Sequence, residues 1–353
     1  MERETNQWDT VIIGGGQSGL AVGYFLKKMN KQFIILEENN RIGDSWRMRW
    51  DSLKLFTPTQ HDSLPGMPFP GSKGSFPRKD EMADYLEGYL KEYSLPVQLN
   101  SKVNHLSAKN NHYEIDASGN KLIAQKVVIA TGTNPFPKIP ALSSDISREI
   151  FQIHSSSYTN PDLLPPGDVL VVGAATSGIE IALEVSKIHR TFISGKPPFH
   201  IPDKAIKYGG ELYWWIIKNI ITIRTPIGKK VKKKIIRGGS PLIRVSSDDL
   251  KVAGVTSLPR VAGVENGYPK LEDGTIIKVK SIIWATGYRP DFSWIGMVDV
   301  TDETGWPVTD RGVSPVKKGL YFMGMPFQFG LTSGLVGGVG RDAAFIARHI
   351  KHN

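Results

Sequence analysis

Cysteine is missing from this 353-residue chain. Disulfides, thiolate metal ligands and redox reactions at paired thiols are therefore excluded. No uninterrupted apolar run reaches the roughly 20 residues that a membrane-spanning helix needs. A short polar stretch precedes the first apolar run, so we expect no signal peptide. Together these absences predict a cytoplasmic protein without a transmembrane segment.

Acidic residues are in the minority, with 34 Asp and Glu against 44 Lys and Arg, a net charge of +10. The excess is concentrated in residues 227–239, IGKKVKKKIIRGG, and is not spread over one face. A solvated basic loop and helix end is the simplest interpretation. Attraction of cofactor phosphates and adhesion to a membrane surface stay open as alternatives. Because the excess is local, we expect no nucleic-acid partner.

The length suits two domains, and residues 9–38 open the first one. They predict a strand, a tight turn, a helix and a second strand, with Gly14, Gly16 and Gly19 in the spacing G-x-G-x-x-G. Such a turn lets backbone N–H groups and a helix N-terminus approach a pyrophosphate. Glu37 ends the second strand, 18 residues after Gly19. A carboxylate there accepts the hydrogen bonds of a ribose diol.

A second unit of the same kind begins at Val169. Gly173 and Gly178 are 5 residues apart, as are Gly14 and Gly19, but Ala175 replaces the middle glycine. Lys196 follows Gly173 by 23 residues, the distance that separates Glu37 from Gly14. A base at this strand end suits a ribose 2′-phosphate, so the second turn is predicted to hold NADPH. Ala175 predicts a looser turn for a cofactor that arrives and leaves on each cycle.

The segment after the first unit carries a family resemblance. It contains Arg41, Gly43, Asp44, Ser45 and Trp46, and resembles the R-x-G-G-S-W motif of class B flavin-dependent monooxygenases, with Asp44 in place of the second glycine. That family includes bacterial single-component enzymes, YUCCA-type plant enzymes and flavoproteins named as cation-efflux accessories. In it the motif wraps FAD.

The resemblance covers nearly the whole chain and implies an α/β fold of two Rossmann-like dinucleotide-binding domains. The NADPH domain, residues 165–284, is inserted in a discontinuous FAD domain, residues 1–164 and 285–353. The implied reaction is oxygenation of a small sulfur, nitrogen or carbonyl substrate with O2 and NADPH, through a C4a-(hydro)peroxyflavin. NADH is expected to serve less well.

The candidate cofactor residues follow from the two turns, the Ala-Thr-Gly turns after strands at 126–129 and 281–284, and the C-terminal stretch 319–350. A helix beginning near Ser333 is expected to point its N-terminus at the flavin. The FAD candidates are Gly14, Gly16, Gln17, Ser18, Gly19, Glu37, Gly43, Asp44, Ser45, Trp46, Val103, Ala130, Thr131, Gly132, Gly324, Ser333 and Leu335. The NADPH candidates are Gly173, Ala174, Ala175, Thr176, Ser177, Gly178, Ser194, Lys196, Ala285, Thr286 and Gly287.

Two departures from the family pattern concern oxygenation. The family fingerprint F-x-G-x-x-x-H-x-x-x-[YF] is half present: His154 and Tyr158 match, and Arg148 and Ile150 do not. His154 is either a catalytic residue or a hydrogen-bonded loop residue. Liver-type members place an Asn after a Phe-Thr or Phe-Ser pair, whereas here Pro58 follows Phe56 and Thr57.

The missing amide leaves Gln60 as the nearest one in sequence, and predicts a short-lived oxygen intermediate. Phe56, Thr57, Gln60 and His154 are thus the catalytic candidates, and no metal site is expected. An NADPH oxidase that releases H2O2, or an accessory flavoprotein of cation efflux, are the alternative functions.

Residues 209–234 combine Trp214, Trp215 and several isoleucines with lysines. A helix that packs on its own domain and partly covers the active-site entrance is favoured over peripheral contact with a membrane. The expected partners are otherwise a small-molecule substrate, O2 and a second copy in a homodimer.

Overall fold

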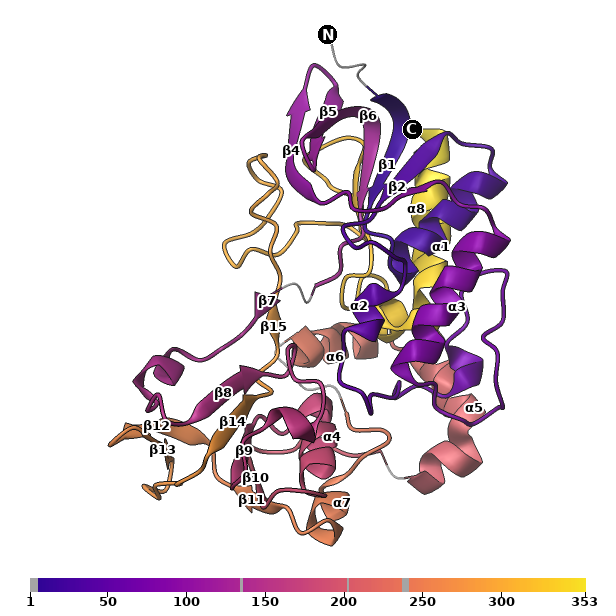
Figure 1. Ribbon diagram of the computed structural model, residues 1–353. Helices are drawn as coiled ribbons and strands as arrows, with labels where there is room; N and C mark the ends of the chain where they lie inside the picture. The colour runs from indigo at the N-terminus through magenta and orange to yellow at the C-terminus, as the bar shows by residue number, and fades with distance from the viewer. Residues whose placement is uncertain (1–5, 134–135, 202, 237–240) are drawn as a thin grey trace.

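The computed structural model describes residues 6–133, 136–201, 203–236 and 241–353. Its two larger sheets are separate, and each is built around parallel strands (Figure 1). The first takes its strands from both ends of the chain, and the second takes them from the middle. This is the α/β arrangement with two dinucleotide-type units that the sequence predicts.

The first sheet has the order β3-β2-β1-β6-β5-β4, with β16 beside β6. Its strands are β1 (Asn6–Ile13), β2 (Phe33–Leu36), β3 (Val97–Gln98), β4 (Val103–Lys109), β5 (His112–Ala117), β6 (Asn120–Ile129) and β16 (Leu320–Phe322). β1, β2, β3, β6 and β16 run parallel, while β4, β5 and β6 form an antiparallel meander. β2 is buried along its whole length, as an apolar run in a covered parallel sheet must be.

Helices α1 (Gln17–Lys28), α3 (Lys79–Glu92) and α8 (Val339–His352) lie together along one side of this sheet (Figure 1). The short helix α2 (Asp44–Arg47) packs against α3. The C-terminal helix begins at Val339 and not near Ser333, because two 3-10 turns, Leu331–Gly334 and Val336–Gly338, come first.

The second sheet is parallel throughout, with the order β11-β10-β9-β14-β8. Its strands are β8 (Phe151–His154), β9 (Val169–Val172), β10 (Thr191–Ser194), β11 (Thr256–Leu258) and β14 (Ser281–Trp284), accompanied by α4 (Thr176–Val185) and α7 (Ser247–Val252). β8 precedes the predicted boundary at 164/165, yet it pairs with β14. This strand therefore groups with the second unit.

Two small antiparallel pairs complete the strands. β12 (Val261–Glu265) pairs with β13 (Tyr268–Leu271), and β7 (Phe136–Pro137) pairs with β15 (Tyr288–Arg289). The second pair lies where the chain passes between the two sheets (Figure 1).

Helices α5 (Asp203–Asn219) and α6 (Pro226–Ile236) leave the second unit and reach the first. Trp214 is buried and stacks on the His61 ring, 4.5 Å between centroids. The connection between α5 and α6 is held by backbone bonds, Ile223 N–H to Phe329 O at 2.9 Å and Leu331 N–H to Ile221 O at 3.0 Å.

One face of α5 is thus packed, as expected of a packing helix, but its contacts include residues of the first unit and not only its own domain, while Leu212 and Trp215 stay exposed on the other face. Among the described helices, none is both long and apolar enough to cross a bilayer.

Candidate cofactor sites

The two predicted turns have the same backbone geometry. Gly14 has φ +105° and Gly173 has φ +112°, values that side-chain-bearing residues rarely adopt. A Cβ at Gly14 would lie 2.6 Å from the carbonyl oxygen of Ala130, and one at Gly173 would lie 2.3 Å from that of Ala285. Each turn therefore packs directly on its own Ala-Thr-Gly segment.

The third glycine of each turn allows the helix to pack on the strand. A Cβ at Gly19 would lie 1.9 Å from Gly14 O, and one at Gly178 would lie 1.8 Å from Gly173 O. No side chain fits at either place, which is the close helix–strand approach that the motif predicts.

The middle positions differ in residue but not in conformation. Gly16 has φ −73° and ψ −174°, and Ala175 has φ −82° and ψ −178°, both ordinary extended values. A Cβ at Gly16 would meet no protein atom within 4 Å. Ala175 is exposed, so its methyl group costs the protein nothing. The two middle positions therefore have the same backbone conformation, and the looser turn expected at Ala175 stays a prediction about the approach of the cofactor.

Glu37 is buried at the end of β2, facing the first turn. Its Oε2 accepts the Gly15 N–H at 2.7 Å, and Oε1 accepts the backbone and side-chain N–H of Asn39 at 3.0 and 2.5 Å. A carboxylate has about four acceptor positions, so capacity remains on Oε2 for one ribose hydroxyl.

Lys196, the equivalent position of the second unit, is exposed and forms no hydrogen bond or ion pair with any described residue. The neighbouring Ser194 is buried, and its hydroxyl donates to Pro259 O at 2.8 Å while accepting the Val261 N–H at 3.0 Å. Its hydroxyl is thus committed to the fold, and Lys196 alone of the two is free to meet a phosphate.

The segment from Arg41 to Trp46 forms a tight loop and α2. Gly43 packs on α3, where a Cβ would lie 2.6 Å from Ala83 O. Asp44 begins α2, and its Oδ1 pairs with Arg41 Nε at 3.0 Å and Arg47 Nη1 at 3.3 Å. The replacement of the second glycine by Asp44 thus gives the loop two ion pairs. Ser45 is exposed and Trp46 is half-buried.

The two Ala-Thr-Gly turns are equivalent as well. The Ala130 N–H donates to Ile13 O and the Ala285 N–H to Val172 O, each at 2.8 Å. Thr131 and Gly132 are exposed beside the first turn, and the Thr286 hydroxyl donates to Lys138 O at 2.5 Å. Gly287 accepts a bond from the His154 ring, which closes the second turn.

The His154 ring is hydrogen-bonded to that turn. Its Nδ1 accepts the Ser156 N–H at 3.1 Å, so Nε2 carries the proton and donates to Gly287 O at 3.0 Å. Burial lowers the pKa of His154, which keeps the ring neutral. Tyr158, the other matching residue of the half fingerprint, is buried and donates to Glu184 Oε2 at 2.8 Å.

The remaining catalytic candidates lie in one loop. Phe56 is partly exposed, and the buried Thr57 hydroxyl donates to Asp62 Oδ1. Gln60 is exposed, with its Oε1 accepting the Gly74 N–H at 2.9 Å. The Gln60 amide therefore points to a neighbouring loop and does not replace the missing asparagine.

Among the C-terminal candidates, Gly324 lies against the start of α1 at the first turn. A Cβ at Gly324 would lie 2.6 Å from the Ser18 hydroxyl. The buried Ser333 hydroxyl accepts the N–H groups of Phe329 and Gly330, each at 3.0 Å. Leu335 lies between the two 3-10 turns, and Val103 begins β4 at the sheet edge. The other candidates are the helix-opening residues Gln17 and Ser18 of α1, Thr176 and Ser177 of α4, and the turn residue Ala174.

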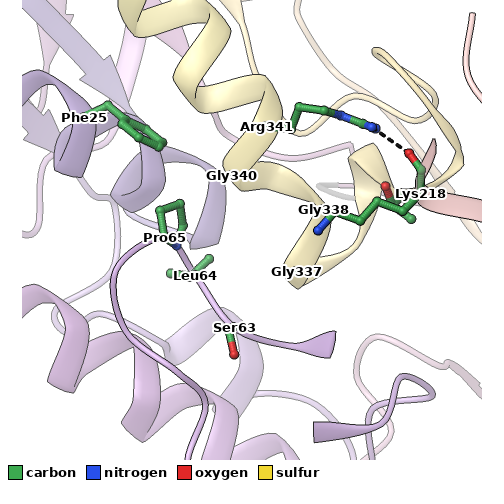
Figure 2. Close-up of a pocket in the computed structure, with 10 residues that line it drawn as sticks. Phe25, Ser63, Leu64, Pro65, Lys218, Gly337, Gly338, Gly340 and Arg341 are labelled. Carbon is green, nitrogen blue, oxygen red and sulfur yellow. Dashed lines mark hydrogen bonds between the residues drawn. The ribbon is translucent and has the colours of Figure 1, made fainter. Parts of the chain in front are cut away.

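A surface cavity of about 280 Å³ lies near the start of α8, lined in part by Ser63, Lys218, Thr332 and Arg341 (Figure 2). Figure 2 shows Arg341 reaching from α8 to the Lys218 carbonyl, a hydrogen bond of 2.6 Å.

Comparison with known proteins agrees with this geometry. A family model described as pyridine nucleotide-disulphide oxidoreductase matches residues 11–196. The uncharacterized oxidoreductase CzcO-like of Geobacillus kaustophilus is 39% identical over 97% of this chain and 98% of its own. The probable indole-3-pyruvate monooxygenase YUCCA8 of Arabidopsis thaliana is 27% identical over 96% of this chain and 88% of its own.

The solved structure of a flavin-containing monooxygenase from Stenotrophomonas maltophilia has a TM-score of 0.81 at 27% identity, covering 99% of both chains. This chain belongs to the class B flavin monooxygenase family. It is an oxidoreductase, and the family assignment from the Arg41–Trp46 motif is confirmed.

The residues of this family member fit a flavin dinucleotide in the first unit. The space at Gly16 is empty of protein atoms, the Glu37 carboxylate keeps a free acceptor position, and Thr131 and Gly132 are open beside it. The second unit fits a nicotinamide dinucleotide, since its turn has the same dihedral angles and Lys196 is unpaired among described residues.

Sequence reasoning missed three residues that lie against the catalytic candidates. Asp62 is fully buried beside Thr57, and burial raises its pKa to about 7. Arg49 Nη1 donates to the Tyr288 hydroxyl at 2.8 Å, and the Tyr288 ring meets His154 edge-on. Arg49 and Tyr288 lie 239 positions apart in sequence, so no local pattern could have joined them.

Proposed function

We propose that the protein is an FAD- and NADPH-dependent monooxygenase that oxygenates small sulfur, nitrogen or carbonyl compounds. One observation carries the proposal: two geometrically equivalent turns whose strand ends bear opposite charges, Glu37 and Lys196. The acid suits a free ribose 2′-hydroxyl and the base a 2′-phosphate. The likeness to named flavin monooxygenases supports the proposed reaction.

Bound flavin supplies the redox chemistry, accepting hydride from the nicotinamide and activating O2. The chain's own residues bind and orient the two dinucleotides. The turn at Gly16 presents N–H groups and the α1 N-terminus to a pyrophosphate. His154, held neutral, fixes the Gly287 turn by its Nε2–H, and Arg49 joins that turn to the first unit through Tyr288.

NADPH oxidation with release of H2O2 is the second candidate, and the Phe56–Gln60 loop favours it. Pro58 lacks a backbone N–H, the Thr57 hydroxyl is bonded to Asp62, and the Gln60 carbonyl oxygen is bonded to Gly74. The side-chain amide of this loop thus belongs to Gln60, three residues after Thr57, and not to the position directly after the Phe-Thr pair where liver-type relatives have theirs.

Both candidates are tested by one set of measurements on purified protein. Released cofactor is identified by chromatography, and NADPH, O2, H2O2 and oxygenated product are quantified with thioanisole or a simple ketone. We expect FAD, product and substantial H2O2. Peroxide equal to NADPH consumed, with no product from any substrate, selects the oxidase. Absence of FAD contradicts both.

A further inference from the structure

Three arginines gather around Phe329 and Phe345, and a fourth, Arg348, acts electrostatically on one of them, Arg311. The guanidinium Cζ atoms of Arg311 and Arg341 each lie 4.2 Å from the centre of the Phe329 ring, and that of Arg224 lies 5.3 Å from it. Arg311 also stacks on Phe345, at 4.0 Å. We call Arg224, Arg311, Arg341 and Arg348 the arginine cluster.

Three different parts of the fold build this cluster. Arg341, Phe345 and Arg348 follow one another at spacings of 4 and 3 residues, so they share a face of α8. Arg224 comes from the α5–α6 connection, and Arg311 from the turn before β16. The fold thus brings together charges that are far apart in sequence.

The positive charges are not balanced. None of the four arginines forms an ion pair with a carboxylate in the described part of the chain. The acidic groups that act on Arg311 are Asp342 and Asp310, and the one that acts on Arg341 is Asp342. Asp342 is buried, and burial raises its pKa, against the effects of Ser333, Arg341 and Arg311. Around Arg311 and Arg341 the neighbouring charges are thus mainly guanidiniums, and one of the two carboxylates, Asp342, is desolvated.

Burying the Arg311 and Arg341 guanidinium groups costs free energy, and hydrogen bonds within the protein do not fully offset this cost. Burial lowers the pKa of Arg311 and Arg341, and the neighbouring guanidiniums lower it further against the attraction of Asp342. Nε of Arg311, and Nε and Nη2 of Arg341, are buried without a hydrogen-bond partner. Stacking on Phe329 holds the guanidiniums in place but uses none of their N–H groups.

The cluster is nevertheless open to a ligand. Arg224 is exposed and Arg311 is only half-buried. Nε is the sole Arg311 nitrogen among the buried unpartnered atoms, so its terminal nitrogens are available. The cavity of Figure 2 adjoins the cluster at Arg341 and adds Lys218 and the buried, unpartnered Thr332 hydroxyl.

We infer that the arginine cluster is a binding site for a phosphoryl group, separate from both dinucleotide turns. Guanidinium N–H groups match phosphoryl oxygens in geometry and form charge-assisted hydrogen bonds with them. A dianion neutralises more of the excess positive charge than a carboxylate or chloride does. The phosphoryl group comes either from a soluble phosphate compound or from a phospholipid headgroup.

The test uses the full chain loaded with FAD and saturated with NADP+, so that neither dinucleotide turn is open to the probe. Inorganic phosphate and pyrophosphate are titrated by calorimetry, with chloride keeping the ionic strength constant. Arg224→Gln and Arg311→Gln are compared with wild type. Arg190→Gln is the matched control, because Arg190 is also exposed and stacks on a phenylalanine, Phe192, at 5.1 Å. Lys196→Ala reports any probe bound at the second turn.

We expect wild type, Arg190→Gln and Lys196→Ala to bind the probe alike, and both cluster variants to bind it roughly tenfold or more weakly. Unchanged flavin absorbance in Arg224→Gln shows that the fold persists. Equal affinity of wild type and Arg224→Gln, or no binding to wild type, overturns the inference. Co-sedimentation with phosphatidic acid vesicles, but not phosphatidylcholine vesicles, and its loss in Arg224→Gln identifies the headgroup as the source. Binding of free phosphate alone identifies a soluble compound.

Discussion

The glycines of the first turn are required for different physical reasons. Gly19 is fixed by the protein itself, since a Cβ there meets Gly14 O at 1.9 Å, whereas Gly16 meets no protein atom. One motif therefore contains a glycine needed for folding and a glycine left for a ligand.

Gly19→Ala and Gly16→Val separate these demands. We expect Gly19→Ala to lower the free energy of unfolding by about 1–3 kcal/mol or more, because backbone must move. Gly16→Val is expected to keep the unfolding free energy of the apoprotein and lose FAD, since the new side chain fills the pyrophosphate space. Calorimetry of apoprotein and the absorbance ratio of flavin to protein measure the two effects. A yellow Gly16→Val protein at full occupancy contradicts the assignment of the first turn.

Lys196 is the residue on which cofactor preference is expected to depend. A lysine–phosphate bond is worth roughly 1.5–3 kcal/mol, or about 10- to 150-fold in KM. Lys196→Ala should raise KM for NADPH, leave KM for NADH nearly unchanged, and reduce the effect of salt on NADPH binding. Ser194→Ala should not reproduce this change in KM, because the Ser194 hydroxyl is already bonded to Pro259 and Val261. Equal KM values for both nucleotides in wild type would refute the role of Lys196.

Asp62 gives the protein a pH dependence of stability. Burial raises its pKa to about 7 in the folded state, while the unfolded value is about 3.9. Between these values the folded state binds more protons, so the free energy of unfolding falls as pH rises from about 4 to about 7.

Asp62→Asn removes this ionisation and keeps the shape of the side chain. The unfolding free energy of the variant minus that of wild type should therefore be larger at pH 8 than at pH 5, by on the order of 1–3 kcal/mol. Urea titrations at both pH values measure the gain. Glu180, whose pKa burial also raises to about 7, contributes a similar slope to both proteins and cancels in the difference. A difference that does not change with pH shows that Asp62 is ionised in the folded protein.

At the scale of elements, α5 is the part of the second unit that docks on the first. Trp214 and Ile217 are buried, and Trp214 stacks on His61. Trp215, the next residue, is 55% exposed. Two adjacent tryptophans thus have opposite environments on one helix.

Trp214→Ala should release α5 from the first unit, since removal of a buried tryptophan costs about 3–5 kcal/mol. Trp215→Ala is the matched control and should change the unfolding free energy by less than about 1 kcal/mol. Hydrogen exchange of residues 210–224 measures the release, and we expect faster exchange only in Trp214→Ala. Similar exchange in both variants would mean that the backbone bonds at Ile221 and Ile223 hold the segment without the stack.

At the scale of the whole molecule, the sequence predicted what depends on local spacing. Both turns, the strands that flank them and the family could be read from glycines, from Glu37 and from the Arg41–Trp46 motif. Contacts between distant segments could not be read in this way. The pairing of β8 with β14, the Arg49–Tyr288 bond and the arginine cluster all depend on tertiary packing.

The start of the C-terminal helix was also predicted wrongly. The helix expected near Ser333 begins at Val339, because the Ser333 hydroxyl accepts backbone N–H groups of Phe329 and Gly330 and stabilises a 3-10 turn.

The placement of β16 in the first sheet has a consequence for biosynthesis. Leu320 pairs with Val127, and α8 packs along α1, so the first sheet cannot be completed until the C-terminal residues have left the ribosome. The second sheet needs only residues 151–284 and is available earlier. During translation the unfinished β6 edge is therefore exposed while its neighbour folds, and this interval is where a truncated or stalled chain is most prone to aggregate.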